Sequence, residues 1–364
     1  MLSLLLGLPL APAWAQRFAA IGDYGYAGSP ERDVSQLVKS WSPEFIITLG
    51  DNNYDVGAAS TIDDNIGQYY HEFIAPYQGR YGAGATENRF FPSLGNHDLY
   101  TNAGAAYLAY FTLPGNERYY DFVRGNVHFF AVNSDGSEPD GTGRFSAQAR
   151  WLKERLAAST APWKVVYFHH APYSSGSHGS DRGLRWPFRE WGASLVLTGH
   201  DHTYERVVAD GLVYCVNGLG GRSLYSFNGT PLDGSAVRYN ADYGAQLLEA
   251  SADSLRLRFY TRTGQLIDDH TLVRGLAAEP QLLGVYPLPI SEAARVEISL
   301  PAAFSSVRVR VLDARGRQVA TLHQGPLPGG RHELQWSRQG LAAGTYFVQL
   351  QVKGYAPVKR TVVL

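Results

Sequence analysis

Five short apolar runs in this sequence are each followed directly by a turn that carries aspartate, asparagine or histidine. In chain order, the runs and their turns are residues 18–21 with 22–25, 45–49 with 50–54, 90–94 with 95–98, 165–168 with 169–172, and 195–198 with 199–202. A short apolar run bounded in this way is typical of a buried strand. Because open α/β sheets bind their ligands at the carboxyl ends of strands, the pattern predicts that five strands deliver polar side chains to one edge of a sheet.

The side chains in these turns are of the types that bind metal ions. Taken alone, each turn has an ordinary alternative, a structural turn or a helix cap. A set of two aspartates, one asparagine, one tyrosine and three histidines drawn from these turns gives about seven donors, which is more than one tetrahedral zinc ion accepts. The single cysteine excludes a thiolate zinc site. Two cations that share a carboxylate, about 3.5–4 Å apart, can activate water and stabilise an in-line displacement at phosphorus, so we expect two integral metal ions.

Composition and charge exclude several other classes of protein. A chain of 364 residues is longer than one ordinary core requires, so we expect two domains. The formal net charge is −1 and no basic run is present, so the sequence predicts no nucleic-acid-binding surface. The one cysteine, Cys215, excludes a disulfide framework.

The chain divides into three segments of different pattern. Residues 1–15 read as an export signal peptide, with an apolar core and the A-x-A site Ala13-Trp14-Ala15. No other stretch is long and apolar enough to predict a transmembrane segment. Residues 16–275 mix strands with helices and form the predicted catalytic domain of class α/β. In residues 276–364 apolar residues alternate between glycine turns, which predicts a small all-β, Ig-like sandwich.

Three helices are predicted inside the first of these domains. Ser29 as N-cap and Pro30 at the first helical position begin a helix between the first two strands. This arrangement is a β-α-β unit, which implies parallel strands and a right-handed crossover. A second helix is expected from Ser60 or Thr61 through residue 73, and a third is capped by Ser146.

The polar turns also match, in order, the motifs of a known family. GDxG is matched by Gly22-Asp23-Tyr24-Gly25, GDxxY by residues 50–54 and GNHD by residues 95–98. A histidine followed by x-Pro is matched by His170-Ala171-Pro172, and GHxH by residues 199–202. Through them the chain resembles the calcineurin-like metallophosphoesterases and, more narrowly, the purple acid phosphatases of the tartrate-resistant type. The resemblance implies a four-layer α/β/β/α sandwich and a dinuclear centre that hydrolyses phosphate monoesters by in-line attack of a metal-bound hydroxide.

The resemblance also implies a set of metal ligands. Carried over by position, they are Asp23, Tyr54 and His202 for the first ion, Asn96, His170 and His200 for the second, and Asp51 as the bridge. A phenolate ligand implies Fe(III) in the Tyr54 site, with Fe, Zn or Mn in the other. The following x-Pro register favours His170 over its neighbour His169, which is then expected to point into the fold.

Two further histidines are candidates for catalysis. His97 resembles the outer histidine that contacts the phosphoryl group, although a histidine there could also only orient a ligand. His178 resembles the acid that protonates the leaving oxygen.

The tail resembles another group of domains. Three stretches are similar to the C-terminal sorting domains of proteins exported by the type IX secretion route: Tyr286-Pro287-Leu288-Pro289, residues 311–317 and residues 341–346. The resemblance implies that the type IX secretion machinery reads this domain as an address. With the signal peptide, it predicts a secreted or cell-surface enzyme.

Three functions remain open on the sequence alone. The first is a phosphomonoesterase of the acid phosphatase kind, acting on a small-molecule phosphate ester. The second is a phosphodiesterase or nucleotidase that uses the same centre, because substrate choice lies in the loops. The third is a surface binding protein in which the metal is structural and no turnover occurs.

Overall fold

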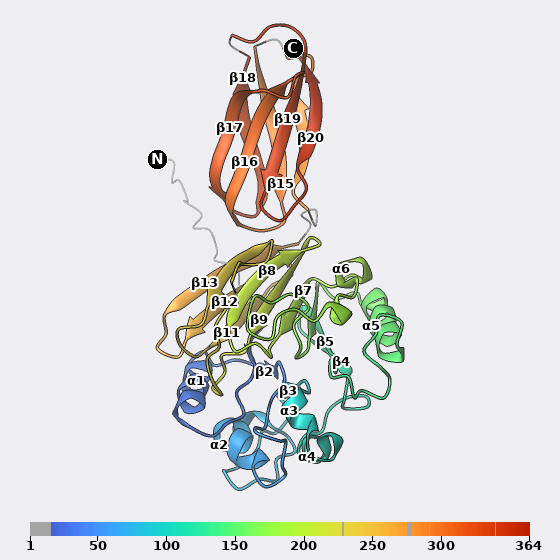
Figure 1. Cartoon of the computed structure of the whole chain (residues 1–364), viewed down its shortest axis with the longest axis vertical. Coiled ribbons are helices and arrows are strands. Elements are labelled where there is room, and N and C mark those ends of the chain that lie inside the picture. Colours follow the sequence, from blue (N-terminus) through green and yellow to red (C-terminus); the bar gives the residue numbers. More distant parts are fainter. Residues whose placement is uncertain (1–15, 228, 275–278, 291, 339) are drawn as a thin grey trace, which may run out of the picture.

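A computed structural model describes residues 16–364, except residues 228, 275–278, 291 and 339. The export signal predicted at 1–15 lies outside the described residues. Two β-sheets form the centre of the larger, N-terminal part (Figure 1). The first has the order β13-β12-β11-β1-β2-β3. Its strands are β1 (Gln16–Ile21), β2 (Phe45–Thr48), β3 (Phe90–Pro92), β11 (Gly244–Ala250), β12 (Ser254–Thr261) and β13 (Leu266–Val273).

The second sheet has the order β10-β8-β9-β7-β6-β5-β4. Its strands are β4 (Tyr120–Arg124), β5 (Val127–Ala131), β6 (Trp163–Tyr167), β7 (Leu195–Thr198), β8 (Tyr204–Ala209), β9 (Leu212–Asn217) and β10 (Ser235–Tyr239). Strands β1, β2 and β3 are parallel, as are β5, β6, β7 and β9. The predicted parallel pair of strands around the first helix is therefore confirmed. Each of the five ligand-bearing turns follows one of these parallel strands. Three of them follow β1, β2 and β3 of the first sheet and two follow β6 and β7 of the second, so the prediction of a single sheet edge was wrong.

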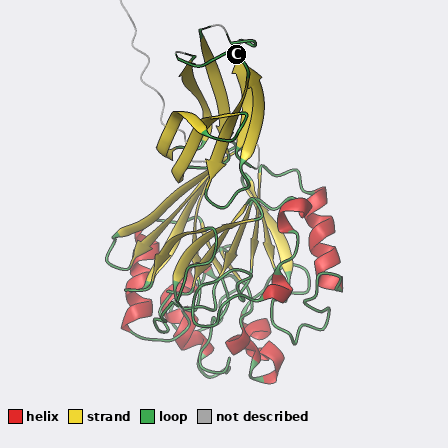
Figure 2. Ribbon diagram, turned by 45° about the horizontal axis from the view of Figure 1, so that its top comes forward, coloured by secondary structure: helices red, strands yellow, loops and turns green. Residues whose placement is uncertain are grey.

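Six α-helices surround the two sheets in the described part of the chain: the first lies outside one sheet, the last two lie outside the other, and the remaining three lie below the sheets in the view of Figure 1 (Figures 1 and 2). They are α1 (Ser29–Ser40), α2 (Gln68–Tyr70), α3 (Asn96–Leu99), α4 (Ala105–Tyr110), α5 (Ala147–Ala158) and α6 (Phe188–Trp191). Neighbouring residues of β5 show the layering, because Phe129 packs against Phe18 and Phe45 of the facing sheet, while Phe130 belongs to a separate core shared with α5 and α6. The four-layer sandwich expected from the sequence is confirmed.

One predicted helix boundary is confirmed and two predictions were wrong. Ser146 caps α5, since its Oγ accepts the backbone N–H of Ala149 at 3.1 Å. The N-cap prediction at Ser29 was wrong by one position, because Gly28 is the N-cap residue and makes no side-chain cap. The second predicted helix is instead a π turn at Asp63–Gly67, the short α2 and a 3₁₀ turn at His71–Phe73.

The C-terminal part is an all-β sandwich, as predicted. A three-stranded sheet, β14-β15-β18, packs on a four-stranded sheet, β17-β16-β19-β20. Their bounds are β14 (Gln281–Tyr286), β15 (Ala293–Leu300), β16 (Phe304–Asp313), β17 (Gln318–Leu327), β18 (Gly330–Ser337), β19 (Thr345–Val352) and β20 (Val358–Val363). Alternate residues such as Val307, Val309 and Val311 fill the space between the sheets, where all three are fully buried. In the part of the chain that the structure describes, no helix has the length and apolarity to cross a membrane.

Candidate metal centre

The turns after the parallel strands hold ligand-type residues in an unusual backbone conformation. Asp23, Asp51 and His200 have φ values of 56°, 54° and 69°. Non-glycine residues rarely adopt this left-handed region, and those that do are often found at functional sites. Two glycines of the motifs are needed for close approach, since a Cβ at Gly95 would lie 2.2 Å from Asp51 Oδ1 and one at Gly199 would lie 2.5 Å from Asp23 Oδ2.

The first group of polar atoms gathers around the phenol of Tyr54. Its hydroxyl oxygen lies 2.8 Å from Asp51 Oδ2, 3.2 Å from Asp23 Oδ1 and 3.1 Å from His202 Nε2. His202 Nε2 is also 3.3 Å from Asp23 Oδ1. The other ring nitrogen of His202 is 2.6 Å from Ser223 Oγ, which orients the imidazole toward the group. We call Asp23, Asp51, Tyr54 and His202 the tyrosine group.

The second group gathers around His169. Its Nε2 lies 3.0 Å from Asn96 Oδ1, 3.1 Å from His200 Nδ1 and 3.3 Å from Asp51 Oδ2. Its Nδ1 lies 2.8 Å from the carbonyl oxygen of Leu49, so Nδ1 carries the proton and Nε2 faces the other three side chains. We call Asp51, Asn96, His169 and His200 the histidine group. The two groups share Asp51.

His169 therefore lies at the position that the sequence interpretation gave to His170, and ligand atoms of His169, His170 and His200 all lie within 4.8 Å of one another. His169 is fully buried and does not point away from the centre, contrary to expectation. His170 borders the histidine group, with its ring 4.4 Å from that of His200, but its Nδ1 is 3.0 Å from Ser134 Oγ. Because two adjacent residues at a strand end face opposite ways, the x-Pro register could not decide between them, and the geometry favours His169.

The electrostatics of the protein alone indicate that this cluster is built for cations. Burial, followed by the charges of Asp23 and Asp51, raises the pKa of Tyr54 well above its ordinary value. Burial alone would lower the pKa of His169, but the charges of Asp51 and Asp23 raise it to about 10. Burial raises the pKa of Asp51, but the charge and hydrogen bond of His169, with the charge of His97 and the hydrogen bond from Tyr54, together hold it below its usual value. One imidazolium offsets the charge of the buried carboxylates only in part, and bound cations would replace its proton and ionise the phenol.

Two residues that the sequence interpretation did not use hold the turns together. The carboxylate of Asp98 accepts the backbone N–H of Asn52 at 3.0 Å, its side-chain amide at 2.8 Å and the N–H of Gly95 at 2.9 Å. Asn52 in turn accepts a hydrogen bond from the hydroxyl of Tyr24 at 3.0 Å. Asp98 and Asn52 thereby join the turn that carries Asp51 to the turn that carries Asn96. Their signal in the sequence was the last residue of GNHD and the third of GDxxY.

The two catalytic candidates contact different residues of the cluster. The backbone N–H of His97 donates to Asp51 Oδ1 at 3.0 Å, and its ring lies 4.4 Å from the ring of Tyr54. The ring of His178 stacks on that of His200 at 4.1 Å, and its backbone N–H donates to Asp201 Oδ1 at 2.7 Å. His97 is half-buried and His178 is exposed, so both can reach a ligand from solvent.

A glycine-rich loop that follows β9 also borders the cluster. In residues 218–225, Ser223 contacts His202 as described, and the ring of Tyr225 stacks on that of His202 at 4.0 Å. The backbone N–H of Arg222 donates to the carbonyl oxygen of Asp23 at 3.1 Å. The sequence did not indicate a functional role for this loop, because its only distinctive feature is the run Gly218-Leu219-Gly220-Gly221 after a predicted strand.

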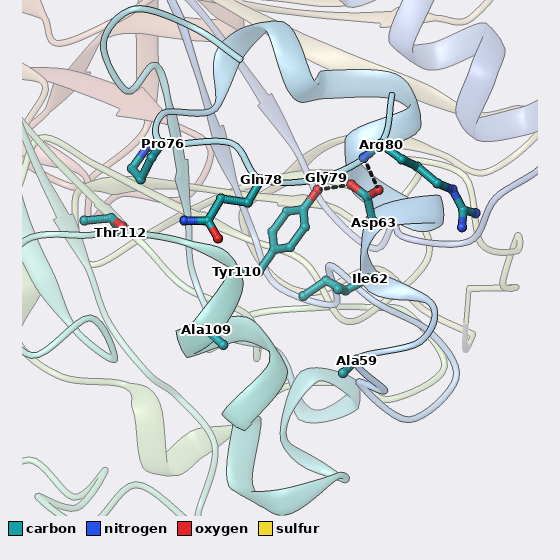
Figure 3. Close-up of a pocket in the computed structure, with 10 residues that line it drawn as sticks. All are labelled: Ala59, Ile62, Asp63, Pro76, Gln78, Gly79, Arg80, Ala109, Tyr110 and Thr112. Atoms are coloured by element: carbon teal, nitrogen blue, oxygen red, sulfur yellow. Dashed lines mark hydrogen bonds between the residues drawn. The ribbon is translucent and has the colours of Figure 1, made fainter. Parts of the chain in front are cut away.

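A cavity of about 440 Å³ lies away from these groups, between the segment 59–80 and residues 109–112 (Figure 3). The hydroxyl of Tyr110 points to the carboxylate of Asp63 and donates to it at 2.8 Å, while the side chain of Arg80 points away. Asp63 also accepts the hydroxyl of Tyr77 at 2.7 Å and the backbone N–H of Arg80 at 2.9 Å. Its hydrogen bonds thus join three segments of the fold, and none of the candidate ligands lines the cavity.

Comparisons with known proteins agree with this fold. Residues 16–204 match the calcineurin-like phosphoesterase family, and residues 290–354 match the FlgD Ig-like domain. Purple acid phosphatase 17 of Arabidopsis thaliana is 26% identical over 220 residues, which cover 52% of this chain and 63% of that protein. Tartrate-resistant acid phosphatase type 5 of Rattus norvegicus is 26% identical over 261 residues, which cover 59% of this chain and 77% of that protein.

Two solved structures share the fold. Purple acid phosphatase PPD1 from yellow lupin seeds superposes with a TM-score of 0.59 at 18% identity, over 71% of this chain and 53% of that chain. GAP50, the anchor in the inner membrane complex of Plasmodium, superposes with a TM-score of 0.57 at 19% identity, over 71% of this chain and 88% of that chain.

Fold, residue groups and homologues together support a metal-dependent phosphoesterase with a dinuclear centre. Because the family match at residues 16–204 covers more than half of the chain, the protein belongs to the calcineurin-like phosphoesterase family. The C-terminal match is to a different Ig-like domain from the sorting domain that the sequence suggested.

Proposed function

We propose that this protein is an acid phosphatase that hydrolyses small-molecule phosphate monoesters at a dinuclear metal centre. The observation that carries the proposal is that Asp51 belongs to both groups of buried donor atoms. The ligands would be Asp23, Tyr54 and His202 for one ion, Asn96, His169 and His200 for the other, and Asp51 for both. When bound, the two cations would supply a nucleophile from water and neutralise charge at phosphorus.

The residues around the cluster would bind and orient the ester. The imidazole of His97 would donate a hydrogen bond to a phosphoryl oxygen, and its position is held by the bond between its Nδ1 and the carbonyl oxygen of Asp55 at 2.5 Å. His178, which is exposed, would donate a proton to the leaving oxygen. The ring of His178 stacks on the ring of His200, and this contact holds the His178 imidazole beside the histidine group.

The two sites would hold different metals. A phenolate with a carboxylate favours a trivalent ion, so the tyrosine group would take Fe(III). Asn96, His169 and His200 bring no charge of their own, and with Asp51 they suit Fe, Zn or Mn in the divalent state.

Hydrolysis of p-nitrophenyl phosphate and of bis(p-nitrophenyl) phosphate by the metal-loaded protein tests the reaction. We expect turnover of the monoester with a kcat/KM at least about 10-fold above that of the diester, a difference of roughly 1.4 kcal/mol in transition-state stabilisation. A preference for the diester would instead indicate the phosphodiesterase or nucleotidase activity. Full metal loading without turnover of either ester would indicate a binding protein.

We propose that residues 1–15 direct export of the protein and that the C-terminal domain directs its sorting at the outer membrane. The supports are the signal-like residues 1–15 and the tail motifs that resemble type IX sorting domains. Expression of the full chain and of a chain that ends at residue 280, in a bacterium with a type IX system, tests the role of the tail. The full chain should appear at the cell surface or in the medium and the shortened chain should remain in the periplasm; equal export of both would contradict the proposal.

A further inference from the structure

Arg222 lies beside the tyrosine group without belonging to it. Its backbone is fixed to the turn of Asp23 by the hydrogen bond described above. Its guanidinium carbon lies 4.3 Å from the centre of the Tyr26 ring and 5.4 Å from the centre of the Tyr54 ring. The hydroxyl of Tyr54 is the central atom of the tyrosine group, so a cationic side chain is held against the edge of the cluster.

The ion pair between the Arg222 guanidinium and Asp55 is weak. Arg222 Nη2 donates to Asp55 Oδ1 at 2.8 Å, and the two side chains are 32% and 60% exposed. Ion pairs this exposed contribute little to stability, because water and salt screen them. An incoming anion can therefore replace Asp55 at small cost, while the stacking on Tyr26 keeps the guanidinium in place.

Asp55 also contacts a second candidate group for binding phosphate, the ring of His97. The carbonyl oxygen of Asp55 bonds the ring of His97, while the carboxylate of Asp55 bonds Arg222. Both His97 and Arg222 flank the ring of Tyr54. Two donors that suit phosphate oxygens thus lie against the ring of Tyr54, and the guanidinium can bind two oxygens at once.

We propose that Arg222 binds a non-bridging oxygen of the substrate phosphate and thereby selects dianionic monoesters over monoanionic diesters. The proposal rests on the proposed phosphatase function and names the residue that sets its substrate class. A monoester presents two negative charges on three free oxygens, so it can satisfy the cations and the guanidinium together. A diester replaces one of these oxygens with an ester group, and it offers less charge to Arg222.

The substitution Arg222→Gln tests this role, with Arg262→Gln as the matched control. Arg262 also pairs with an aspartate, Asp242 at 2.8 Å, lies 5.3 Å from the ring centre of Tyr243, and is 29% exposed. For Arg222→Gln, the kcat/KM for p-nitrophenyl phosphate should fall about 10- to 100-fold, as expected for a lost hydrogen bond to a charged group. The kcat/KM for the bis ester should change less than about 3-fold.

Three further measurements separate binding from structure. Inorganic phosphate should inhibit Arg222→Gln about 10-fold more weakly than wild type, while metal content stays the same. Arg222→Lys should recover part of the loss, since it keeps the charge but not the planar fork. Asp55→Asn should strengthen phosphate inhibition about 2- to 5-fold, because the competing carboxylate is gone.

An equal loss for both esters, or a loss that is accompanied by reduced metal content, would overturn the proposal in favour of a structural role. Unchanged monoester hydrolysis in Arg222→Gln would also overturn it. If wild type hydrolyses neither ester, the proposed phosphatase function fails, and the titration with inorganic phosphate still decides whether Arg222 binds a phosphoryl group.

Discussion

The tyrosine group and the histidine group meet at Asp51, yet they differ in charge and in access. The first adds a carboxylate and an ionisable phenol to one imidazole, whereas the second adds a carboxamide and two imidazoles. Asp23, Tyr54 and His202 are each at most 3% exposed, while Asn96 and His200 are only half-buried. The tyrosine group is thus suited to hold a highly charged ion permanently, and the histidine group to hold a divalent ion within reach of substrate.

Loss of the shared carboxylate should have the largest effect, because it removes a ligand from both groups. In Asp51→Asn the affinity for both metals and the kcat/KM for the monoester should fall by more than about 100-fold, beyond the range seen for outer partners of metal ligands. Elemental analysis and initial rates after metal loading check this. Retention of both ions with full turnover would show that the two groups do not share a ligand.

The adjacent histidines give the sharpest test of how the histidine group is built. His169→Ala should lose the ion of that group, with an affinity loss of more than about 100-fold, whereas His170→Ala should lose less than about 10-fold. The tyrosine group should keep its ion in both variants. Isothermal titration with Zn²⁺ of protein that carries iron measures the difference. The reverse order of losses would restore the interpretation based on the x-Pro register.

Removal of the phenol should affect the tyrosine group alone. Tyr54→Phe should lose any visible charge-transfer band together with Fe(III), while the ion of the histidine group remains, because the phenol does not contact Asn96, His169 or His200. Absorption spectra and metal content after growth with iron and zinc record both effects. A wild-type protein that is fully loaded and colourless would place the chain outside the purple branch of the family.

The metal-free protein should show an effect on stability and not on metal binding, because its stability should depend on pH through His169. Its folded pKa of about 10 is above the ordinary value of about 6.5. Its contribution to stability is therefore complete below about pH 6.5 and is lost as the pH rises through the folded value, by at most about 1.4 kcal/mol per pH unit. Denaturant unfolding between these pH values should show this decline in wild type and not in His169→Gln. Saturation with both cations should flatten it, because they displace the proton.

The five strands and the polar turns after them were predictable because each turn follows an apolar run. Parallel strands of one sheet must bring the ends of such runs to one edge, so Asp23, Asp51 and Asn96 could be placed together without a structure. His200 follows a strand of the other sheet, and only the packing of the two sheets brings it to the same site. The choice between His169 and His170 could not be made, since it depends on the backbone path after β6. The helix predicted up to residue 73 failed for a tertiary reason, because the Asn65 side chain bonds Asn53 and the backbone of Tyr54.

The loop of residues 218–225 shows the other limit of the sequence. Arg222 and Ser223 reach the cluster only because Gly220 and Gly221 allow the backbone to pass close to Tyr24 and Glu31. Neither residue belongs to a motif or to a periodic pattern, so only the structure could place them beside Tyr54 and His202.

Titration of metal-free protein with Fe and Zn, followed by elemental analysis and by the rate of p-nitrophenyl phosphate hydrolysis, tests the central claim most directly. Two ions per chain should bind, and the rate should reach its maximum only when the second site is filled. Full activity with one ion, or with none, would contradict a centre in which Asp51 joins two cations.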